Sequence, residues 1–292
     1  MENIVKLFST GQKGLSCLRG IIHKFGEGIL SGVVIGVDNN VENDLSAETI
    51  ELCLQHNIAH TLYPETIDVP YEIGIAAGWQ RIIHDIPSSR LIIFHDSLLP
   101  KYRGFAPLVS ALLNQDAQIG VTALKGESKF DTGDIYLQKS ATVSYPTTIG
   151  NAIELIATLY FDIAQEIISQ HLSGELTATP QNESQATYSL WRDEEDYRID
   201  WSQDAGYLSH FVDCVGSPYR GASFIALDRL YRVHKATALS DLEIINRTPG
   251  KIIYFDGNTP IIVCGSGLLR LDHFQPESSD HSPHLNLRTR LL

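Results

Sequence analysis

The fold is decided by the stretch Leu91–Gly104, which reads LIIFHDSLLPKYRG. Its first four residues, Leu91–Phe94, are all apolar and follow one another without a break, which is typical of a strand buried on both faces. His95 comes directly after this run. In open α/β folds, the carboxyl ends of the parallel strands form the edge at which ligands bind. The stretch therefore predicts a buried strand that carries His95 to a ligand-binding edge.

Segments on both sides of this stretch alternate between strand patterns and helix patterns. Apolar, β-prone runs predict strands at residues 4–8, 33–37, 119–125 and 134–143. Apolar residues at helical spacing predict helices at residues 15–22, 48–55 and 148–171. The short apolar run 73–77 fits either type of element. This alternation predicts an α/β fold, with a mainly parallel sheet covered by helices on both faces.

The second half of the chain changes its pattern after a polar segment. Residues 175–190 contain Pro180 and few apolar side chains, which is typical of a linker. Beyond it, the sequence predicts one short helix at about residues 204–214 and several short strands divided by glycine and proline. A length of 292 residues accommodates one large and one small domain. We therefore expect a larger domain at residues 1–185 and a small β-rich domain at residues 186–292.

Composition and charge exclude several classes of protein. The chain carries 22 Lys and Arg against 35 Asp and Glu, a net charge of −13, which argues against a broad nucleic-acid-binding face. The longest mostly apolar stretch, Gly28–Val37, is too short to span a bilayer, and the N-terminus does not resemble a signal peptide. The 4 cysteines are widely spaced, which predicts reduced thiols. These features predict a cytoplasmic protein that binds neither nucleic acid nor membrane.

A histidine and a carboxylate are the groups that suggest catalysis. The sequence DTGD begins at Asp131, 36 residues after His95 and between two predicted strands. If both side chains reach the same edge of the sheet, Asp131 can orient the imidazole of His95 for general acid–base work. A purely structural histidine–aspartate pair would leave the same pattern, so these residues alone support both interpretations equally. His84, His210, His234 and His273 have no ligand-like spacing, and no metal site is predicted.

The two motifs together resemble a known family. HDSLLPKYRG, with DTGD starting 36 residues after its histidine, is similar to the folate-dependent formyltransferases, which act on methionyl-tRNA, glycinamide ribonucleotide or nucleotide sugars. The sequence GWQRII, residues 78–83, resembles the loop with which these enzymes hold the pterin of 10-formyltetrahydrofolate. GVT at residues 120–122 resembles the strand before the catalytic aspartate. The resemblance extends over essentially the whole chain.

The resemblance implies a Rossmann-like catalytic domain, a co-substrate and a mechanism. It implies 10-formyltetrahydrofolate as the formyl donor, and as its contacts the residues Gly78, Arg81, Ile82, Ile83 and Asp131. An uncharged amine would attack the formyl carbon directly, without a metal or a covalent enzyme intermediate. In this scheme His95 is the base or oxyanion partner, and Asp131 orients it.

One position departs from the family pattern. The family usually has Asn two residues before the histidine, where its side chain donates a hydrogen bond to the developing oxyanion. In this chain the position is Ile93, whose side chain has no donor. Loss of one oxyanion donor typically costs a factor of about 10²–10³ in rate. Either another donor substitutes for the missing amide, or the chain is a weak or altered enzyme.

A further resemblance and the distribution of charge suggest the acceptor amine. Residues 191–201 and 217–222 are similar to the appended domain of the tRNA and sugar enzymes, which disfavours a ribonucleotide acceptor. No Lys or Arg occurs from Phe25 to Gln80, whereas nine carboxylates do, in the region where the tRNA enzymes carry a basic insertion. A negative surface there would repel tRNA. We therefore expect a nucleotide-diphosphate amino sugar, in which the resemblance places the amine on a 4-amino-4,6-dideoxyhexose.

Candidate acceptor-binding residues lie in the first loop and in the central motif, namely Lys13, Ser97, Lys101, Tyr102 and Arg103. A homodimer is an option, because the sugar enzymes that the chain resembles often pair. Three alternative functions stay open: a methionyl-tRNA formyltransferase, a hydrolase that releases formate from the same co-substrate, and a non-catalytic module that binds pterin or nucleotide. The identity of the nucleotide and the stereochemistry of the sugar are not encoded in any of these motifs.

Overall fold

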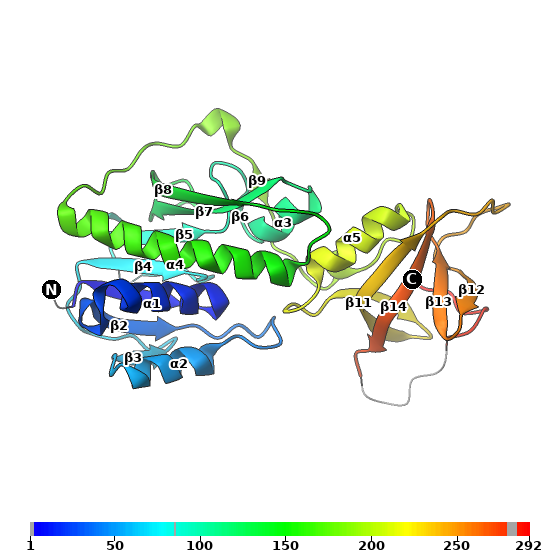
Figure 1. Ribbon diagram of the computed structural model, residues 1–292, viewed down its shortest axis with the longest axis horizontal. Coiled ribbons are helices and arrows are strands. Elements are labelled where there is room, and N and C mark those ends of the chain that lie inside the picture. The colour runs from blue at the N-terminus through cyan, green and yellow to red at the C-terminus, as the bar shows by residue number, and fades with distance from the viewer. Residues whose placement is uncertain (1–2, 85, 279–284) are drawn as a thin grey trace. The chain divides into compact units, whose positions relative to one another are not determined.

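The computed structural model describes residues 3–84, 86–278 and 285–292 (Figure 1). Its contacts divide the chain into two compact units. One unit comprises Met1–Ser144 and Asn151–Trp191, and the other comprises Tyr145–Gly150 and Arg192–Leu292. The main division between these units falls between residues 191 and 192.

The first unit is built on a seven-stranded sheet. Its strands are β1 (Val5–Ser9), β2 (Leu30–Ile35), β3 (His60–Leu62), β4 (Ile73–Ala77), β5 (Leu91–His95), β7 (Gln118–Lys125) and β8 (Ile135–Thr142), in the order β3-β2-β1-β4-β5-β7-β8. The first five strands of that order run parallel, whereas β7 is antiparallel to β5 and β8 to β7. The predicted mainly parallel α/β sheet is confirmed, and the run 73–77 proves to be a strand.

Helices and irregular segments cover this sheet. The helices of the first unit are α1 (Gly11–Phe25), α2 (Ser46–Gln55), α3 (Pro107–Leu113) and α4 (Ile149–Ser173), the last of which belongs to this unit from Asn151 onward. Figure 1 shows α1 and α4 on the same side of the sheet, and a Cβ on Gly20 of α1 would lie 2.4 Å from the carbonyl of Phe161 in α4. A separate apolar cluster includes Phe8 and Ala76 from the strands, and Trp79 and Ile83 from the segment after β4 pack against it.

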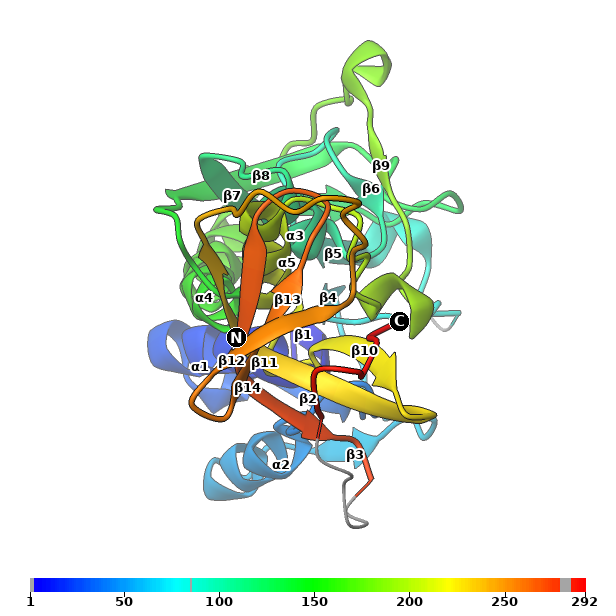
Figure 2. The same cartoon turned by 90° about the vertical axis from the view of Figure 1, so that its right-hand side faces the viewer.

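The second unit is a small antiparallel domain. Its elements are α5 (Ala205–Val215), β10 (Ala222–Ala226), β11 (Arg229–Leu239), β12 (Ile252–Asp256), β13 (Thr259–Val263) and β14 (Leu268–Pro276), and the strand order is β10-β11-β14-β13-β12. Figure 2 shows its strands in yellow to red, and α5 packs on β11 and β14. The predicted β-rich domain with one short helix is confirmed. None of the helices described is long and apolar enough to cross a membrane.

Candidate active site

His95 is the last residue of β5, so the strand itself sets its position. Its side chain is 8% exposed, and its main chain pairs with Thr122 of β7. The loop that follows is held by the hydroxyl of Thr122, which accepts from the amide of Leu99 at 3.1 Å and donates to the carbonyl of Ser97 at 2.6 Å. The histidine therefore stands on a rigid strand and beneath a loop fixed by buried hydrogen bonds.

The imidazole is oriented by a main-chain carbonyl that sequence analysis did not identify. Nε2 of His95 lies 2.8 Å from the carbonyl oxygen of Tyr102. A carbonyl can only accept, so Nε2 carries a hydrogen and donates it. In the neutral ring, Nδ1 is then the nitrogen with a free lone pair. In this tautomer the fold leaves Nδ1 as the ring nitrogen that can accept a proton.

Asp131 stands beside this nitrogen. It lies in the loop between β7 and β8, and its Oδ1 is 3.5 Å from Nδ1 of His95. Its other oxygen, Oδ2, accepts a hydrogen bond of 2.8 Å from the amide of Gly104. Both side chains are largely buried, with 8% and 11% exposure. A carboxylate at this position can stabilise an imidazolium that forms when His95 takes a proton. The structure therefore brings together the two residues singled out as catalytic.

Asp96 is a second carboxylate next to His95, and its partners differ. It forms an ion pair with Lys13, from the first turn of α1. It also accepts a hydrogen bond of 2.5 Å from the hydroxyl of Tyr160 in α4. Burial, and next the charge of Asp96, raise the pKa of Tyr160 well above its ordinary value, so the phenol stays a donor. Lys13, expected at the acceptor, is thus 19% exposed and joined to Asp96.

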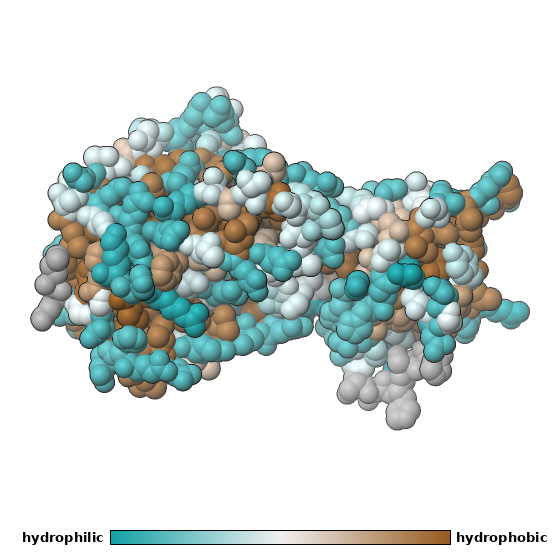
Figure 3. Space-filling model, viewed as in Figure 1, coloured by the Kyte–Doolittle hydropathy of each residue, from teal (hydrophilic) through white to brown (hydrophobic). Residues whose placement is uncertain are grey.

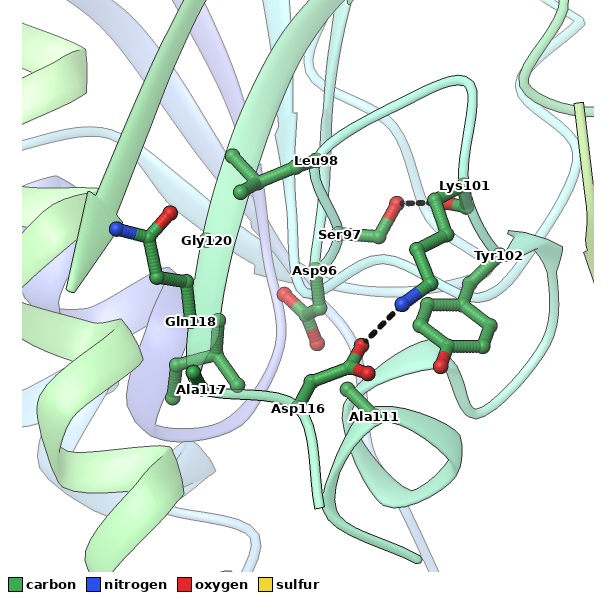
Figure 4. A pocket seen from close by; sticks show the side chains of 11 residues that line it. Asp96, Ser97, Leu98, Lys101, Tyr102, Ala111, Asp116, Ala117, Gln118 and Gly120 are labelled. Carbon is green, nitrogen blue, oxygen red and sulfur yellow. Dashed lines mark hydrogen bonds and ion pairs between the residues drawn. The ribbon is translucent and has the colours of Figure 1, made fainter. Parts of the chain in front are cut away.

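A cavity of about 370 Å³ opens beside the motif, in the size range of small-molecule sites (Figure 4). Ser97, Lys101 and Tyr102, three of the expected acceptor residues, line it together with Asp96 and Asp116. Nζ of Lys101 donates to Oδ2 of Asp116 at 2.6 Å and lies 4.7 Å from the ring centre of Tyr102. Partial burial lowers the pKa of Lys101, but the hydrogen bond to Asp116 and further contacts raise it by more, so the net shift is upward. At 48% exposure, Lys101 remains a cation that a ligand can reach.

Arg103 is placed differently from the other cations. Its side chain is 1% exposed and is bound to Gln181 and Glu183 in the segment that precedes β9 (Tyr188–Ser189). The hydrogen bond to Glu183, as the largest cause, raises the pKa of Arg103. A role for Arg103 in binding the acceptor stays a prediction, and it would require Glu183 to move away. Gln181 was not identified from the sequence, because it lies in a polar segment that fits a linker.

Apart from Asp131, the residues expected to hold the pterin lie in one partly exposed segment after β4. Gly78 has a φ of +65°, and a Cβ at this position would lie 2.4 Å from the carbonyl of Thr10, so the turn requires glycine. Nη2 of Arg81 donates to the carbonyl of Val37 at 2.6 Å, and its guanidinium stacks on the ring of Trp79. Ile82 is 63% exposed, whereas Ile83 packs against the apolar cluster.

Main-chain polar groups in this segment are available to a ligand. Within the part of the chain that the structure describes, the amides and carbonyls of residues 79–83 make no hydrogen bond to other residues. Nε1 of Trp79 is buried and has no partner there either. A heteroaromatic ligand with several donors and acceptors would satisfy such groups. The segment therefore fits the pterin-holding loop that the resemblance to the formyltransferases implied.

Ile93 lies on the same face of β5 as His95, because alternate residues of a strand share a face. Its side chain is partly buried and packs against the cluster that contains Phe8 and Ala76. Its apolar contacts explain how the fold accommodates isoleucine where the family usually has asparagine. Among the described residues, no group of three or more His, Cys, Asp or Glu side chains could hold a metal ion.

Family models match both units of the chain. A model described as "Formyl transferase" matches residues 57–159, and one described as "Formyl transferase, C-terminal domain" matches residues 192–286. The methionyl-tRNA formyltransferase of Marinobacter nauticus is 28% identical over 195 residues, which are 67% of this chain and 62% of that relative. The chain thus spans less than two thirds of that relative's length.

Solved structures share the fold. WlaRD, described as a sugar 3N-formyl transferase in the presence of dTDP and 5-N-formyl-THF, gives a TM-score of 0.67 at 16% identity, with 96% of this chain and 99% of that chain covered. HypX from Aquifex aeolicus, in complex with tetrahydrofolic acid, gives a TM-score of 0.63 at 17% identity, with 96% of this chain but only 45% of that chain covered. At these identities the likeness is one of fold.

Proposed function

We propose, since the chain belongs to the formyl transferase family in both its N-terminal and its C-terminal domain, that it transfers a formyl group from 10-formyltetrahydrofolate to the amine of a nucleotide-linked amino sugar. The observation that carries the reaction is the placement of Nδ1 of His95 next to the carboxylate of Asp131. The other ring nitrogen is held by the carbonyl of Tyr102, so the basic nitrogen and the carboxylate act at one place.

The two side chains suit the proton bookkeeping of formyl transfer. The reaction forms a bond from the amine nitrogen to the formyl carbon and breaks the bond from that carbon to the donor nitrogen. One proton must therefore leave the attacking amine, and one must reach the departing nitrogen. Nδ1 of His95 can take the first and return it as the second, while Asp131 stabilises the imidazolium between the two events. Both proton transfers thus use the same atom, Nδ1 of His95, at the end of β5.

The formyl donor is assigned to the segment after β4. 10-Formyltetrahydrofolate supplies the formyl group when it is bound. The main-chain groups of residues 79–83, which have no hydrogen-bond partner among the described residues, would hold its pterin, and the turn at Gly78 directs that segment back toward the loop after β1. Arg81 is stacked on Trp79 and Tyr63, so the segment is also supported by aromatic contacts. The residues of this segment therefore fit the pterin of the formyl donor.

The sugar acceptor is supported by the acidic surface near the catalytic edge. Asp38, Glu42 and Asp44 lie in the loop after β2, which ends at the same edge of the parallel sheet as β5. The next helix, α2, adds Glu48 and Glu51, and Figure 3 shows hydrophilic residues over α2. A carboxylate-rich loop opposes a polyanion such as the acceptor arm of tRNA. A nucleotide-diphosphate sugar needs only a local cation, and Lys101 in the cavity provides one.

A methionyl-tRNA formyltransferase is the second candidate. It is favoured by the curated relatives, of which the enzyme of Marinobacter nauticus is an example at 28% identity. Charge argues against it, because Phe25–Gln80 contains no Lys or Arg. The two candidates share the formyl donor and the roles of His95 and Asp131. They differ in the acceptor alone, so a direct assay separates them.

The assay supplies purified protein with 10-formyltetrahydrofolate and one acceptor at a time. The acceptors are dTDP-, UDP- and GDP-linked amino sugars and charged initiator tRNA, with a reaction lacking acceptor as the blank. Tetrahydrofolate, formate and the formylated product are followed, and His95→Asn serves as the inactive control. Transfer to a sugar supports the proposal, and transfer to tRNA supports the second candidate. Formate without acceptor would indicate a hydrolase, and binding without any product would overturn the enzymatic proposal.

A further inference from the structure

The segment that follows α4 returns to the catalytic edge as a strap, defined as residues 179–189. Its first residue, Thr179, exchanges two main-chain hydrogen bonds of 2.8 Å with Ile135 at the start of β8. Its last two residues form β9, which pairs with β6 (Arg103–Gly104). Figure 1 shows the chain after α4, which includes the strap, passing over to the β6–β9 pair. Both ends of the strap are therefore fixed by the main chain, without help from its side chains.

Gln181, near the start of the strap, reaches the loop that carries Asp131. Its Nε2 donates to the carbonyl of Asp131 at 2.8 Å and to the carbonyl of Gly133 at 2.7 Å. Asp131 has a φ of +55°, a conformation that is uncommon for residues other than glycine and that persists where the surroundings support it. Gln181 therefore donates both of its amide hydrogens to this turn.

Arg103 holds the other end of the Gln181 amide. Its Nε and Nη2 donate to Oε1 of Gln181 at 3.1 and 2.8 Å. Its Nη1 and Nη2 also donate to the two carboxylate oxygens of Glu183 at 2.8 and 2.7 Å. Because a guanidinium only donates, it fixes the orientation of the amide, with the oxygen toward Arg103 and the nitrogen toward Asp131.

Gly104 completes a ring of contacts around Asp131. It follows Arg103 directly, and its amide donates to Oδ2 of Asp131 at 2.8 Å. The carboxylate of Asp131 is thus held through Gly104 and its main chain through Gln181, while Arg103 connects the two supports. A Cβ on Gly104 would lie 2.6 Å from the carbonyl of Ser189, so the pairing of β6 with the strap requires glycine here.

We propose that Gln181 is a positioning residue for Asp131, held in turn by Arg103 and Glu183. Because the strap is already anchored at both ends, the side chain of Gln181 is not needed to hold the strap, and its bonds serve the Asp131 loop. The inference rests on the proposed function, which gives Asp131 its part in proton transfer. It predicts that loss of the two amide donors slows turnover without weakening the binding of the formyl donor.

The first test compares Gln181→Glu with Gln185→Ala, an exposed glutamine of the same strap. Glutamate keeps an oxygen for Arg103 but cannot donate to the two carbonyls. We expect kcat to fall by about 10- to 100-fold, with KM for the formyl donor changed by less than about twofold, because a small misplacement of a catalytic group can cost about 10²-fold. Gln185→Ala should match the wild type. Wild-type kcat in Gln181→Glu, with Gln181→Met tested in parallel as an uncharged replacement, would overturn the proposal.

The second test asks whether Gln181 acts through Asp131. In an Asp131→Asn background the positioned carboxylate is gone, so adding Gln181→Glu should change the single-turnover rate by less than about twofold. A further tenfold fall in the double variant would show that Gln181 acts elsewhere and would overturn the proposal. A merely structural residue would slow both backgrounds alike.

The third test needs no turnover. Hydrogen–deuterium exchange of residues 126–134 is measured in the wild type, Gln181→Glu, Gln181→Met and Gln185→Ala, each with its thermal unfolding midpoint. We expect exchange in this loop to quicken several-fold in both Gln181 variants and to stay unchanged in Gln185→Ala. Unchanged exchange in the Gln181 variants would overturn the positioning role. If the wild type transfers no formyl group, the proposed function is contradicted. The exchange data would still show whether Gln181 orders the loop that carries Asp131.

Discussion

Asp96 and Asp131 are two largely buried carboxylates, one next to His95 along the chain and one beside its ring, and the fold balances their charges in opposite ways. Asp96 is paired with the ammonium of Lys13 and accepts from the hydroxyl of Tyr160. Asp131 is held by a main-chain amide, that of Gly104, and stands 3.5 Å from His95. One carboxylate is neutralised by a permanent cation, and the other faces a group that becomes cationic only when it takes a proton.

This difference in partners suits the two carboxylates to different roles. A carboxylate that already has a cation gains little from a second one, whereas a carboxylate held by neutral donors can stabilise a charge that develops during the reaction. Arg103 is connected to the Asp131 loop through Gln181, and Glu183 balances its charge. The negative charge of Asp131 is thereby left for His95.

The most direct test of the difference between Asp96 and Asp131 is to neutralise each carboxylate in turn. We expect Asp131→Asn to lower kcat by about 10³-fold, because general acid–base groups contribute about 10²–10⁴-fold and the amide cannot stabilise an imidazolium. Asp96→Asn should keep kcat within about tenfold of the wild type, since it leaves the pair of His95 and Asp131 in place, and a loss of acceptor contacts in the cavity would raise KM instead. Steady-state kinetics with a saturating acceptor measure both. Equal losses in the two variants would remove the distinction between the acids.

Removal of the cation from the neutralised carboxylate tests the other half of the comparison. Lys13→Met leaves Asp96 largely buried without its ion-pair partner, and we expect the free energy of unfolding to fall by about 2 kcal/mol. Lys24→Met, at an exposed lysine of the same helix, is the matched control and should be nearly neutral. Urea denaturation followed by circular dichroism gives both values. A loss no larger than that of the control would show that Lys13 does not balance Asp96.

The placement of the two acids could be predicted from the sequence only in part. The apolar run Leu91–Phe94 gives the strand and hence the place of His95, and the spacing of DTGD points to Asp131. Periodicity carries no strand direction, so the antiparallel course of β7 and β8 was not foreseen. The partners Tyr160 and Gln181 lie 64 and 50 residues from the acids that they contact, and no local pattern encodes such pairs.

Ile93 lies two residues before His95 in β5, and its side chain has neither a charge nor a hydrogen-bond donor. A substitution at this position tests whether the site lacks a donor to the oxyanion. We expect Ile93→Asn to raise kcat by about tenfold, a part of the 10²–10³ that one oxyanion donor is typically worth, because the new amide shares a face of β5 with His95. Ile93→Leu, which adds no donor, is the control. Kinetics and thermal unfolding are measured together, since the polar side chain also loses apolar contacts. An unchanged or lower kcat would indicate that another group already fills this role.

The smallest expected effect concerns Glu183, the acid that keeps Arg103 from competing for Asp131. The hydrogen bond from Arg103 lowers the pKa of Glu183 below its usual value of 4.5. A carboxyl group with a lowered pKa in the folded state contributes stability that is fully present above its unfolded pKa and is lost as the pH falls through the folded pKa. Glutamine cannot ionise, so the unfolding midpoint of Glu183→Gln should lie slightly below that of the wild type at pH 6. The gap should close as the pH drops below about 4.5.

Differential scanning fluorimetry between pH 3 and pH 7 measures this gap, and Glu154→Gln, at an exposed glutamate of α4, is the control that should show none. Because Glu183 is exposed, the gap itself should be slight. The kcat of Glu183→Gln shows whether Glu183 acts by balancing the charge of Arg103 or by keeping Gln181 oriented. Glutamine still accepts from Arg103, so Gln181 stays oriented, and we expect kcat to stay within about threefold of the wild type. A large loss of kcat with an unchanged Asp131 loop would mean that the uncompensated charge of Arg103 reaches Asp131, and that Asp131, like Asp96, is governed by the cation nearest to it.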